Sequence, residues 1–198
     1  MKNFIPIREI LRRYDPEVLR LYYASTHYRK PIEFDEKDVE EPKRELEYLY
    51  NTLRNLKDAS SKEGKESPEL EDAVKETRLR FAEAINNDFN TPQALTNLYA
   101  LAKKANTTAS QQKIRPKTAQ ATIKALTELA NIFGILEKQI PSEAELPDKV
   151  KDLVAKREEA RSKKDWKKAD EIREQIRALG FILEDTSEGP RFRKINNH

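Results

Sequence analysis

A single tryptophan lies in a densely charged stretch of this 198-residue chain, within the sequence RSKKDWKKAD of residues 161–170. Lys and Arg side chains attract phosphate groups, and an exposed Trp ring can stack on an unpaired nucleobase. Arg and Asp side chains can hydrogen-bond the polar edges of bases that are splayed out of a helix. The residue types around Trp166 therefore fit recognition of single-stranded RNA in a loop.

A helix that begins at Trp166 would bring several of these side chains onto one face. Residues on an α-helix advance by about 100°, so Trp166, Asp170, Arg173 and Arg177 fall within roughly 60° of one another. In the helix before it, Arg161 continues the line of the apolar residues and so points toward the partner helix. The expected result is a helical hairpin whose tip gathers one aromatic residue, one acid and several bases.

A purely structural interpretation of the same residues remains open at this point. Trp166 would then cap a small core, and Asp170 would pair with Arg173 along the helix. Such a pair contributes only about 0.2–0.5 kcal/mol. Helical periodicity alone does not choose between this interpretation and a binding role.

Composition points to a mainly α fold. Hydrophobic residues make up 37% of the chain and charged residues another 37%, so we expect a modest core and a densely charged surface. Glycine occurs only four times, which argues against an all-β protein rich in tight turns. The abundant residues, Leu, Ala, Glu, Lys and Arg, favour helix.

Residues 1–140 are predicted to form an antiparallel helical bundle. Two of its helices carry an N-cap residue followed by proline, at Asp15-Pro16 and at Thr91-Pro92. The second helix carries an apolar stripe of Val18, Leu19, Tyr22 and Tyr23. The expected elements are a short amphipathic stretch at 4–14, a helix from 16 that ends before Pro31, helices 35–58, 68–86, 92–106 and 117–138, and an exposed loop at 59–67.

Residues 147–198 are predicted to form a small α+β unit, joined to the bundle by a Pro- and Glu-containing linker at 139–147. A helical hairpin comes first, Gly180 ends its second helix, and a short β-hairpin follows. The expected elements are helices 148–163 and 166–179, strand 181–185, turn 186–190 and strand 191–193.

Charge is unevenly distributed between these two parts. Residues 147–198 hold 14 Lys and Arg against 11 Asp and Glu, so the net charge of +3 for the whole chain lies entirely in the last quarter. An excess of this size is often only a solvated surface. Here it is interleaved with aromatic residues, as in proteins that bind single-stranded nucleic acid.

The sequence also limits metal chemistry and location. It has no cysteine, which excludes disulfides and Cys-ligated metal sites, and His27 and His198 lie far apart, so we expect no metal site. The first residues, MKNFIPIREILRRY, form no long apolar run. We therefore expect a cytoplasmic protein with no signal peptide, no membrane span and no membrane partner.

Three stretches, taken in order, resemble the C-terminal half of cysteinyl-tRNA synthetase, a class I aminoacyl-tRNA synthetase. They are DPEVLRLYYASTHYRKPIEF, NNDFNTPQAL and REEARSKKDWKKADEIREQIRALGFILEDTSEGPRFR. The last is the most specific, since a capped helix start explains DFNTP locally. The resemblance implies that residues 1–140 are the stem-contact segment and anticodon-binding bundle, and that 147–198 are a small anticodon-recognition domain.

The resemblance also implies which residues contact RNA. The family's base-contacting positions are similar to Arg161, Trp166, Asp170 and Asp185 here. Trp166 would stack on an anticodon base, and the other three would hydrogen-bond anticodon bases. Supporting contacts to phosphates are expected from Lys163, Lys164, Lys167, Lys168, Arg191 and Arg193. No catalytic residue is expected.

The departures from the family are equally informative. The family activates cysteine with ATP in an N-terminal domain that carries an HIGH-type motif, a KMSKS-type loop and a zinc ion, and this sequence contains none of these motifs. Its first four residues resemble the segment just after the KMSKS loop. We therefore expect a tRNA-binding module for cysteine tRNA that has no cofactor and no adenylate-forming chemistry of its own.

Two other functions stay open from the sequence. The chain could be a fragment or subunit of an active cysteine–tRNA ligase whose catalytic domain is on another polypeptide. It could instead be a helical adaptor for another protein, with a vestigial RNA site. Partner binding that survives replacement of Arg161, Trp166 and Asp185 together would favour the adaptor.

Overall fold

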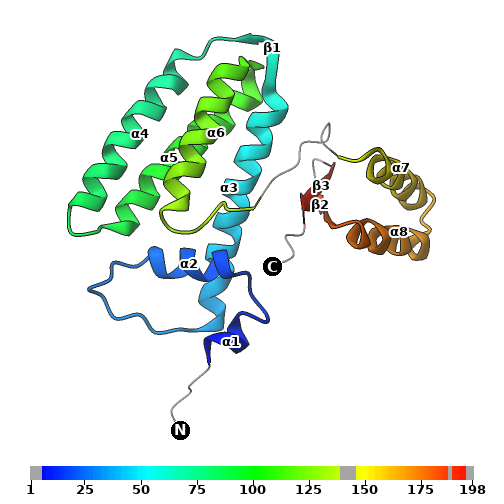
Figure 1. The fold of residues 1–198 in the computed structure, drawn as a ribbon, viewed down its shortest axis with the longest axis horizontal. Helices are drawn as coiled ribbons and strands as arrows, with labels where there is room; N and C mark the ends of the chain where they lie inside the picture. The colour runs from blue at the N-terminus through cyan, green and yellow to red at the C-terminus, as the bar shows by residue number, and fades with distance from the viewer. Residues whose placement is uncertain (1–5, 139–145, 187–188, 195–198) are drawn as a thin grey trace. The chain divides into compact units, whose positions relative to one another are not determined.

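The computed structural model of this chain describes residues 6–138, 146–186 and 189–194, with the backbone alone for 184–186 and 189–194. Over these residues the fold is mainly α (Figure 1), as predicted. The chain divides into two compact units, Met1–Glu137 and Lys138–His198. Each unit is described by itself below.

The first unit is a helical bundle preceded by shorter elements. Helices α3 to α6 lie side by side, and successive helices run in opposite directions (Figure 1), which confirms the predicted antiparallel bundle. Its elements are α1 (Ile7–Ile10), α2 (Pro16–Ala24), the 3-10 helix η1 (Glu36–Val39), α3 (Glu40–Ala59), strand β1 (Ser60–Lys65), α4 (Pro68–Asn86), α5 (Thr91–Gln111) and α6 (Pro116–Asn131).

Side-chain caps start the α-helices α2 and α5. The Asp15 carboxylate accepts a hydrogen bond from the backbone N–H of Glu17 at 3.0 Å, which confirms the predicted start of α2. The cap of α5 is Asn90, whose side-chain oxygen accepts from the N–H of Gln93 at 3.1 Å. The prediction that Thr91 is this cap is wrong by one residue, because Thr91 is already the first residue of the helix.

Helices near the start of the chain are shorter than predicted. The first one, expected over 4–14, is described only as the single turn α1, and residues 1–5 lie outside the described part. The helix expected from residue 35 begins as η1 and becomes α-helical only at Glu40. The Asp35 carboxylate caps the 3-10 turn by accepting from the N–H of Lys37 at 3.1 Å.

The last two bundle helices also end elsewhere than predicted. Helix α5 continues to Gln111 rather than ending near 106. Helix α6 ends at Asn131 rather than 138, because Gly134 and Leu136 adopt left-handed φ angles of 66° and 60° that a helix does not allow.

Strand β1 replaces most of the exposed loop that was predicted for 59–67. Lys65 forms two backbone hydrogen bonds, of 2.9 and 3.2 Å, with the residues on either side of Ile114, which precedes α6. Gly64 allows this approach, because a Cβ atom at that position would lie 2.3 Å from the Ile114 carbonyl carbon. A glycine in such a charged stretch is typical of a loop, whereas the role of Gly64 here is to allow the close approach of a neighbouring backbone.

The core of the bundle consists of apolar side chains from all its long helices, with one buried carboxylate. Glu17 accepts hydrogen bonds from the Tyr50 hydroxyl at 2.8 Å and from the Leu136 N–H at 3.0 Å, which links α2, α3 and the segment after α6. Tyr22 is buried as predicted for its apolar stripe, but Tyr23 is half exposed. That part of the stripe prediction is wrong.

A surface network ties the segment after α2 to the turn between α4 and α5. The Asp88 carboxylate accepts hydrogen bonds from Arg29, at 2.6 and 2.9 Å, and from the Tyr28 hydroxyl, at 2.6 Å. Asp88 and Phe89 both have positive φ angles, of 54° and 49°, so this turn breaks the helix sharply, as predicted. The hydrogen bonds from Arg29 and Tyr28 hold the pKa of Asp88 far below its ordinary value.

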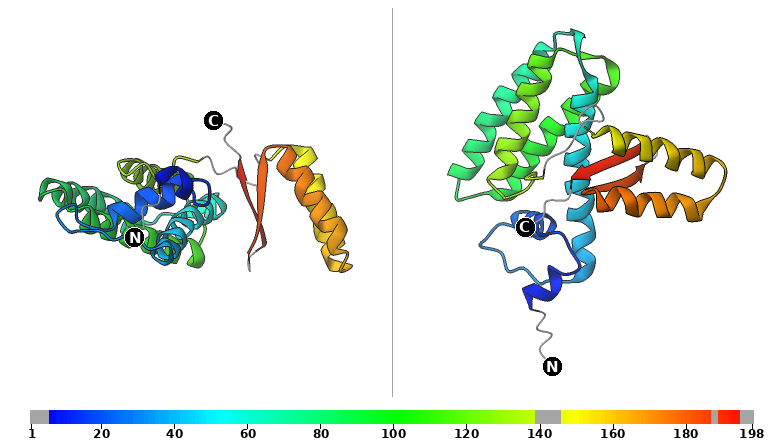
Figure 2. Two further views of the ribbon diagram at one scale, coloured as in Figure 1. Left: turned by 90° about the horizontal axis from the view of Figure 1, so that it is seen from below. Right: turned by 45° about the vertical axis from the view of Figure 1, so that its right-hand side comes forward.

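The second unit is a helical hairpin followed by an antiparallel β-hairpin, as predicted. Strand β2 packs along α8, and Figure 2 shows both strands beside the helical hairpin. Gly180 has a φ angle of 85° just after the last helix, which confirms its predicted capping role. The elements are α7 (Asp148–Ser162), α8 (Trp166–Ala178), β2 (Phe181–Thr186) and β3 (Gly189–Lys194).

The core of this second unit is small. Both helices and β2 contribute to it, and it lies at the end of the hairpin away from its tip. Its buried members are Leu146, Val150, Ile172, Ile176, Phe181 and Leu183. Leu146, near the end of the predicted linker 139–147, is one of these core residues. Residues 139–145 lie outside the described part of the chain.

Candidate nucleic-acid interface

The tip between α7 and α8 is closed by backbone geometry. Lys164 has a left-handed φ angle of 58°, and the N–H of Asp165 donates to the carbonyl of Ala160 at 2.9 Å. Ala160 directly precedes Arg161, and Asp165 directly precedes Trp166. This hydrogen bond therefore holds the backbones of Arg161 and Trp166 close together across the tip.

Asp165 also sets the start of α8. Its side chain accepts a hydrogen bond from the N–H of Lys168 at 3.2 Å, which makes it the N-cap of the helix. Trp166 is consequently the first residue of α8, where its ring is not enclosed by a preceding helical turn. Asp165 is not among the residues predicted to have a role, although an Asp directly before a predicted helix is a typical cap signal.

Trp166 is exposed rather than packed. Its side chain is 60% exposed, and it is not among the residues that form the core of the second unit. The interpretation in which Trp166 caps that core is therefore wrong. Asp170 and Arg173 are also exposed, and within the described residues they do not form the ion pair that the structural interpretation proposed.

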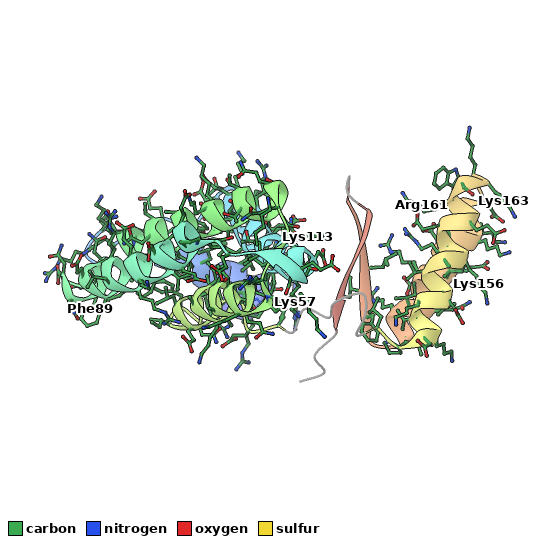
Figure 3. All side chains as sticks on the ribbon, turned by 90° about the horizontal axis from the view of Figure 1, so that it is seen from above. Lys57, Phe89, Lys113, Lys156, Arg161 and Lys163 are labelled. Carbon is green, nitrogen blue, oxygen red and sulfur yellow. The ribbon has the colours of Figure 1, made fainter. Side chains whose placement is uncertain are left out.

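Arg161 is held at the edge of the hairpin. Its side chain is 34% exposed, and its Nη1 atom lies 3.3 Å from Oε1 of Glu158. Arg157, one turn earlier, is buried and contacts the same oxygen at 3.2 Å. Figure 3 shows Arg161 and Lys163 pointing to different sides of the tip. The contact with Glu158 lies within α7 itself, so the predicted direction of Arg161 toward the partner helix stays a prediction.

The four lysines around Trp166 differ in their partners. Lys163 donates from Nζ to Oε1 of Glu159 at 2.6 Å, and this hydrogen bond raises the pKa of Lys163 and lowers that of Glu159. Lys164, Lys167 and Lys168 are exposed and form no ion pair among the residues that the structure describes. These three are therefore better placed than Lys163 to meet a phosphate.

For Asp185, Arg191 and Arg193, which lie in the β-hairpin, the structure describes the backbone position only. In the antiparallel register Asp185 lies opposite Pro190, near the end of β2, and Arg191 lies opposite Glu184. Figure 3 shows β2 running from the end of α8 toward the same end of the unit as Arg161. The side chains of these residues lie outside the described part, so their predicted contacts stay predictions.

The described residues contain no group of side chains that could form a metal site. The sequence contains no cysteine, and over residues 6–138 and the described part of the second unit no three His, Asp or Glu side chains gather as a possible metal site. In the same residues, no helix combines the length and the apolar character that crossing a membrane requires.

Comparison with known protein families follows the two-unit division closely. Residues 143–193 match the model of the cysteinyl-tRNA ligase anticodon binding domain, and residues 80–137 match the DALR domain model. Residues 1–44 match the model of the class I (C) tRNA synthetase catalytic domain. These matches place the chain among the class I aminoacyl-tRNA synthetases.

Curated relatives narrow this class to one family. The cysteine–tRNA ligase of Symbiobacterium thermophilum is 37% identical over 97% of this chain and 41% of its own length. Those of Oenococcus oeni and Thermococcus gammatolerans are each 34% identical over 98% of this chain. The chain corresponds to the C-terminal half of the cysteine–tRNA ligases, which confirms the predicted family. It spans about two fifths of the length of these relatives.

Proposed function

We propose that this chain binds tRNA through its second unit and recognises the anticodon loop of cysteine tRNA. The exposed Trp166 at the start of α8 is the observation that carries the proposal, because this residue is 60% exposed at a lysine-rich tip and lies outside the core of the unit. The match of residues 143–193 to an anticodon binding domain supports the same ligand.

In the proposed complex Trp166 stacks on one anticodon base. Arg161 donates hydrogen bonds to a base edge, while Asp170 and Asp185 accept them from exocyclic amino groups. The lysines of the tip, together with Arg191 and Arg193, contact phosphates. Stacking contributes affinity to any base, so the three charged side chains carry the choice among bases.

We further propose that the chain forms no cysteinyl adenylate by itself. In full-length members of the family, ATP and zinc would act in the catalytic domain. The sequence supports this proposal, because it contains neither an HIGH-type nor a KMSKS-type motif and no cysteine that could bind zinc.

Replacing Trp166 with alanine tests the proposal directly. We expect the dissociation constant for a cysteine tRNA transcript to rise about 5- to 150-fold, because stacking contributes about 1–3 kcal/mol per base. Titration of the tRNA by fluorescence anisotropy measures this change. Thermal unfolding should change little, because an exposed ring contributes little to stability.

Phe89 provides a matched control in the other unit. Its ring is 65% exposed, close to the exposure of Trp166, and it lies in the turn between α4 and α5. Because Phe89 belongs to the predicted anticodon-binding bundle, Phe89→Ala is expected to weaken tRNA binding less than Trp166→Ala does, rather than to have no effect. Equal affinities for the parent and Trp166→Ala proteins would refute the stacking role.

A second candidate function rests on the match of residues 1–44 to a catalytic-domain model. In that case this chain acts as the tRNA-binding part of a cysteine–tRNA ligase whose catalytic domain is on another polypeptide. Adding the chain to such a domain should then raise cysteine transfer to tRNA, measured as acid-precipitable radiolabelled cysteine. Transfer that does not change on addition of the chain would exclude this function.

A further inference from the structure

Glu158 joins two arginines on the last turns of α7. Its Oε1 atom accepts from Nη1 of Arg157 at 3.2 Å and from Nη1 of Arg161 at 3.3 Å. The Arg157 side chain is only 5% exposed, whereas those of Glu158 and Arg161 are 44% and 34% exposed. One carboxylate oxygen thus connects a buried guanidinium to one at the edge of the candidate interface.

Helix geometry explains why this connection fixes Arg161. Arg157 and Arg161 are one helical turn apart, where two like charges repel each other. The shared carboxylate offsets that repulsion. Sequence neighbours do not normally face each other on a helix, so the simultaneous contact of Glu158 with Arg157 and Arg161 is an additional constraint on where the Arg161 guanidinium lies.

We propose that Glu158 is a positioning residue for anticodon recognition. It holds the Arg161 guanidinium against the hairpin. The inference rests on the proposed function of Arg161 in reading a base. Glu158 itself contacts no RNA. It restricts the orientations that Arg161 can adopt, so that the guanidinium meets one base edge rather than any nearby phosphate.

The contact length suits such a role. Strong charge-assisted hydrogen bonds have donor–acceptor distances of about 2.7–2.9 Å, and both contacts to Glu158 are longer. A contact of this kind uses one of the five N–H donors that a guanidinium carries in a fixed planar fork, and so it limits the orientation of that fork.

The negative charge of Glu158 has an opposite effect on overall affinity. A carboxylate close to the tip repels RNA phosphates. At about 0.1 M salt, charges within about 10 Å of each other still interact, whereas charges farther apart are largely screened. Neutralising Glu158 should therefore leave general RNA affinity unchanged or raise it, while discrimination between anticodons falls. A residue with only a structural role would lower both together.

The experiment compares the binding of cysteine tRNA with that of transcripts in which each anticodon base is replaced in turn. The discrimination ratio is the dissociation constant for an altered transcript divided by that for cysteine tRNA. For Glu158→Gln we expect this ratio to fall about three- to tenfold at one anticodon position, which is less than the loss of a complete base contact would cause. Affinity for the altered transcripts should stay the same or rise. Glu158→Asp, which keeps the charge but shortens the side chain, should lower the ratio without raising affinity.

Glu159 is the matched control. It is the next residue along α7, also carries a carboxylate, and pairs with Lys163 rather than with an arginine. Glu159→Gln removes the same charge from the same turn, so it should leave the discrimination ratio at the value of the parent protein. Thermal unfolding of each variant verifies that the unit remains folded.

A double substitution separates failure of this inference from failure of the proposed function. If Glu158 acts through Arg161, Glu158→Gln should not lower discrimination further in an Arg161→Ala background. If Arg161→Ala lowers discrimination and Glu158→Gln does not, the positioning role of Glu158 is refuted while the function stands. If Arg161→Ala has no effect on discrimination, the proposed role of Arg161 is itself refuted.

Discussion

The helical bundle and the tip of the second unit are stabilised in different ways. In the bundle, large side chains such as Leu49, Phe81 and Leu98 are fully buried along the lengths of the helices. Near the tip of the second unit, by contrast, the buried apolar side chains among the described residues are those of Ala160 and Ala169. Backbone hydrogen bonds and the Asp165 cap hold the tip instead.

This difference shows how a small unit can present an aromatic ring without burying it. A large apolar residue near other apolar side chains is usually drawn into a core, because burial of its surface is favourable. Only small alanines are buried at the tip, and the larger core residues lie elsewhere in the unit, so no apolar surface draws Trp166 inward. The ring remains available for an external partner.

The largest expected effect is in the bundle. Phe81 is 2% exposed and packs against Phe133, with 5.6 Å between ring centres. Phe81→Ala should lower the free energy of unfolding of the bundle by about 3–5 kcal/mol, measured by urea denaturation. Affinity for tRNA through the second unit should change much less. If hydrogen exchange showed that Phe81→Ala destabilises both units equally, this comparison would be contradicted.

A smaller loss of stability is expected from the core of the second unit. Ile176 is fully buried there, and Ile→Ala substitutions in cores cost about 2–5 kcal/mol. Because this core is small, the loss should be enough to raise amide hydrogen exchange throughout α7 and α8 while the bundle stays protected. Ala178→Gly, at an exposed position of the same helix, is the control and should affect only the local helix end.

The smallest effect concerns Asp88 and depends on pH. Its pKa is lowered in the folded state, first by the hydrogen bonds from Arg29 and then by that from Tyr28. A lowered carboxylate pKa stabilises the fold above the unfolded value of about 3.9, and that stability is lost as pH falls through the folded pKa. The difference in melting temperature between parent and Asp88→Asn should thus be largest above pH 5 and shrink toward pH 2.

Asp72 serves as the control for the pH experiment. It is an exposed carboxylate that pairs with Lys75 one turn away on α4, and such surface pairs contribute little to stability. Asp72→Asn should show a smaller change of melting temperature across the same pH range. A difference for Asp88→Asn that stays constant from pH 7 to pH 2 would show that Asp88 stabilises the fold without its charge.

Much of the second unit could be predicted from its sequence, because local signals there agree. Helical periodicity placed Trp166 and Asp170 on one helix, and Gly180 marked the end of α8. The contact of Arg161 with Glu158 could not be predicted in this way. Glu158 can reach several basic side chains, and only the burial of Arg157 selects its partners.

In the bundle, the predictions from sequence were wrong at places where segments distant in the chain contact each other. The sequence of β1 looks like an exposed loop, because its serines, lysines and glycine favour turns. Its pairing with the segment around Ile114 depends on residues some 50 positions away. The early end of α6 likewise depends on Leu136, whose N–H is held by Glu17 of α2. Local propensity does not contain such contacts.

The sequence by itself determined the family, the order and type of most helices, and the residue types at the candidate interface, because these follow from local patterns and from resemblance. The tertiary structure decided which side chains are exposed and which charges are paired. It left Trp166 outside the core, and it joined the buried Arg157 and the half-buried Arg161 through Glu158. Long side chains have several partners within reach, and only the packing of the folded chain selects among them.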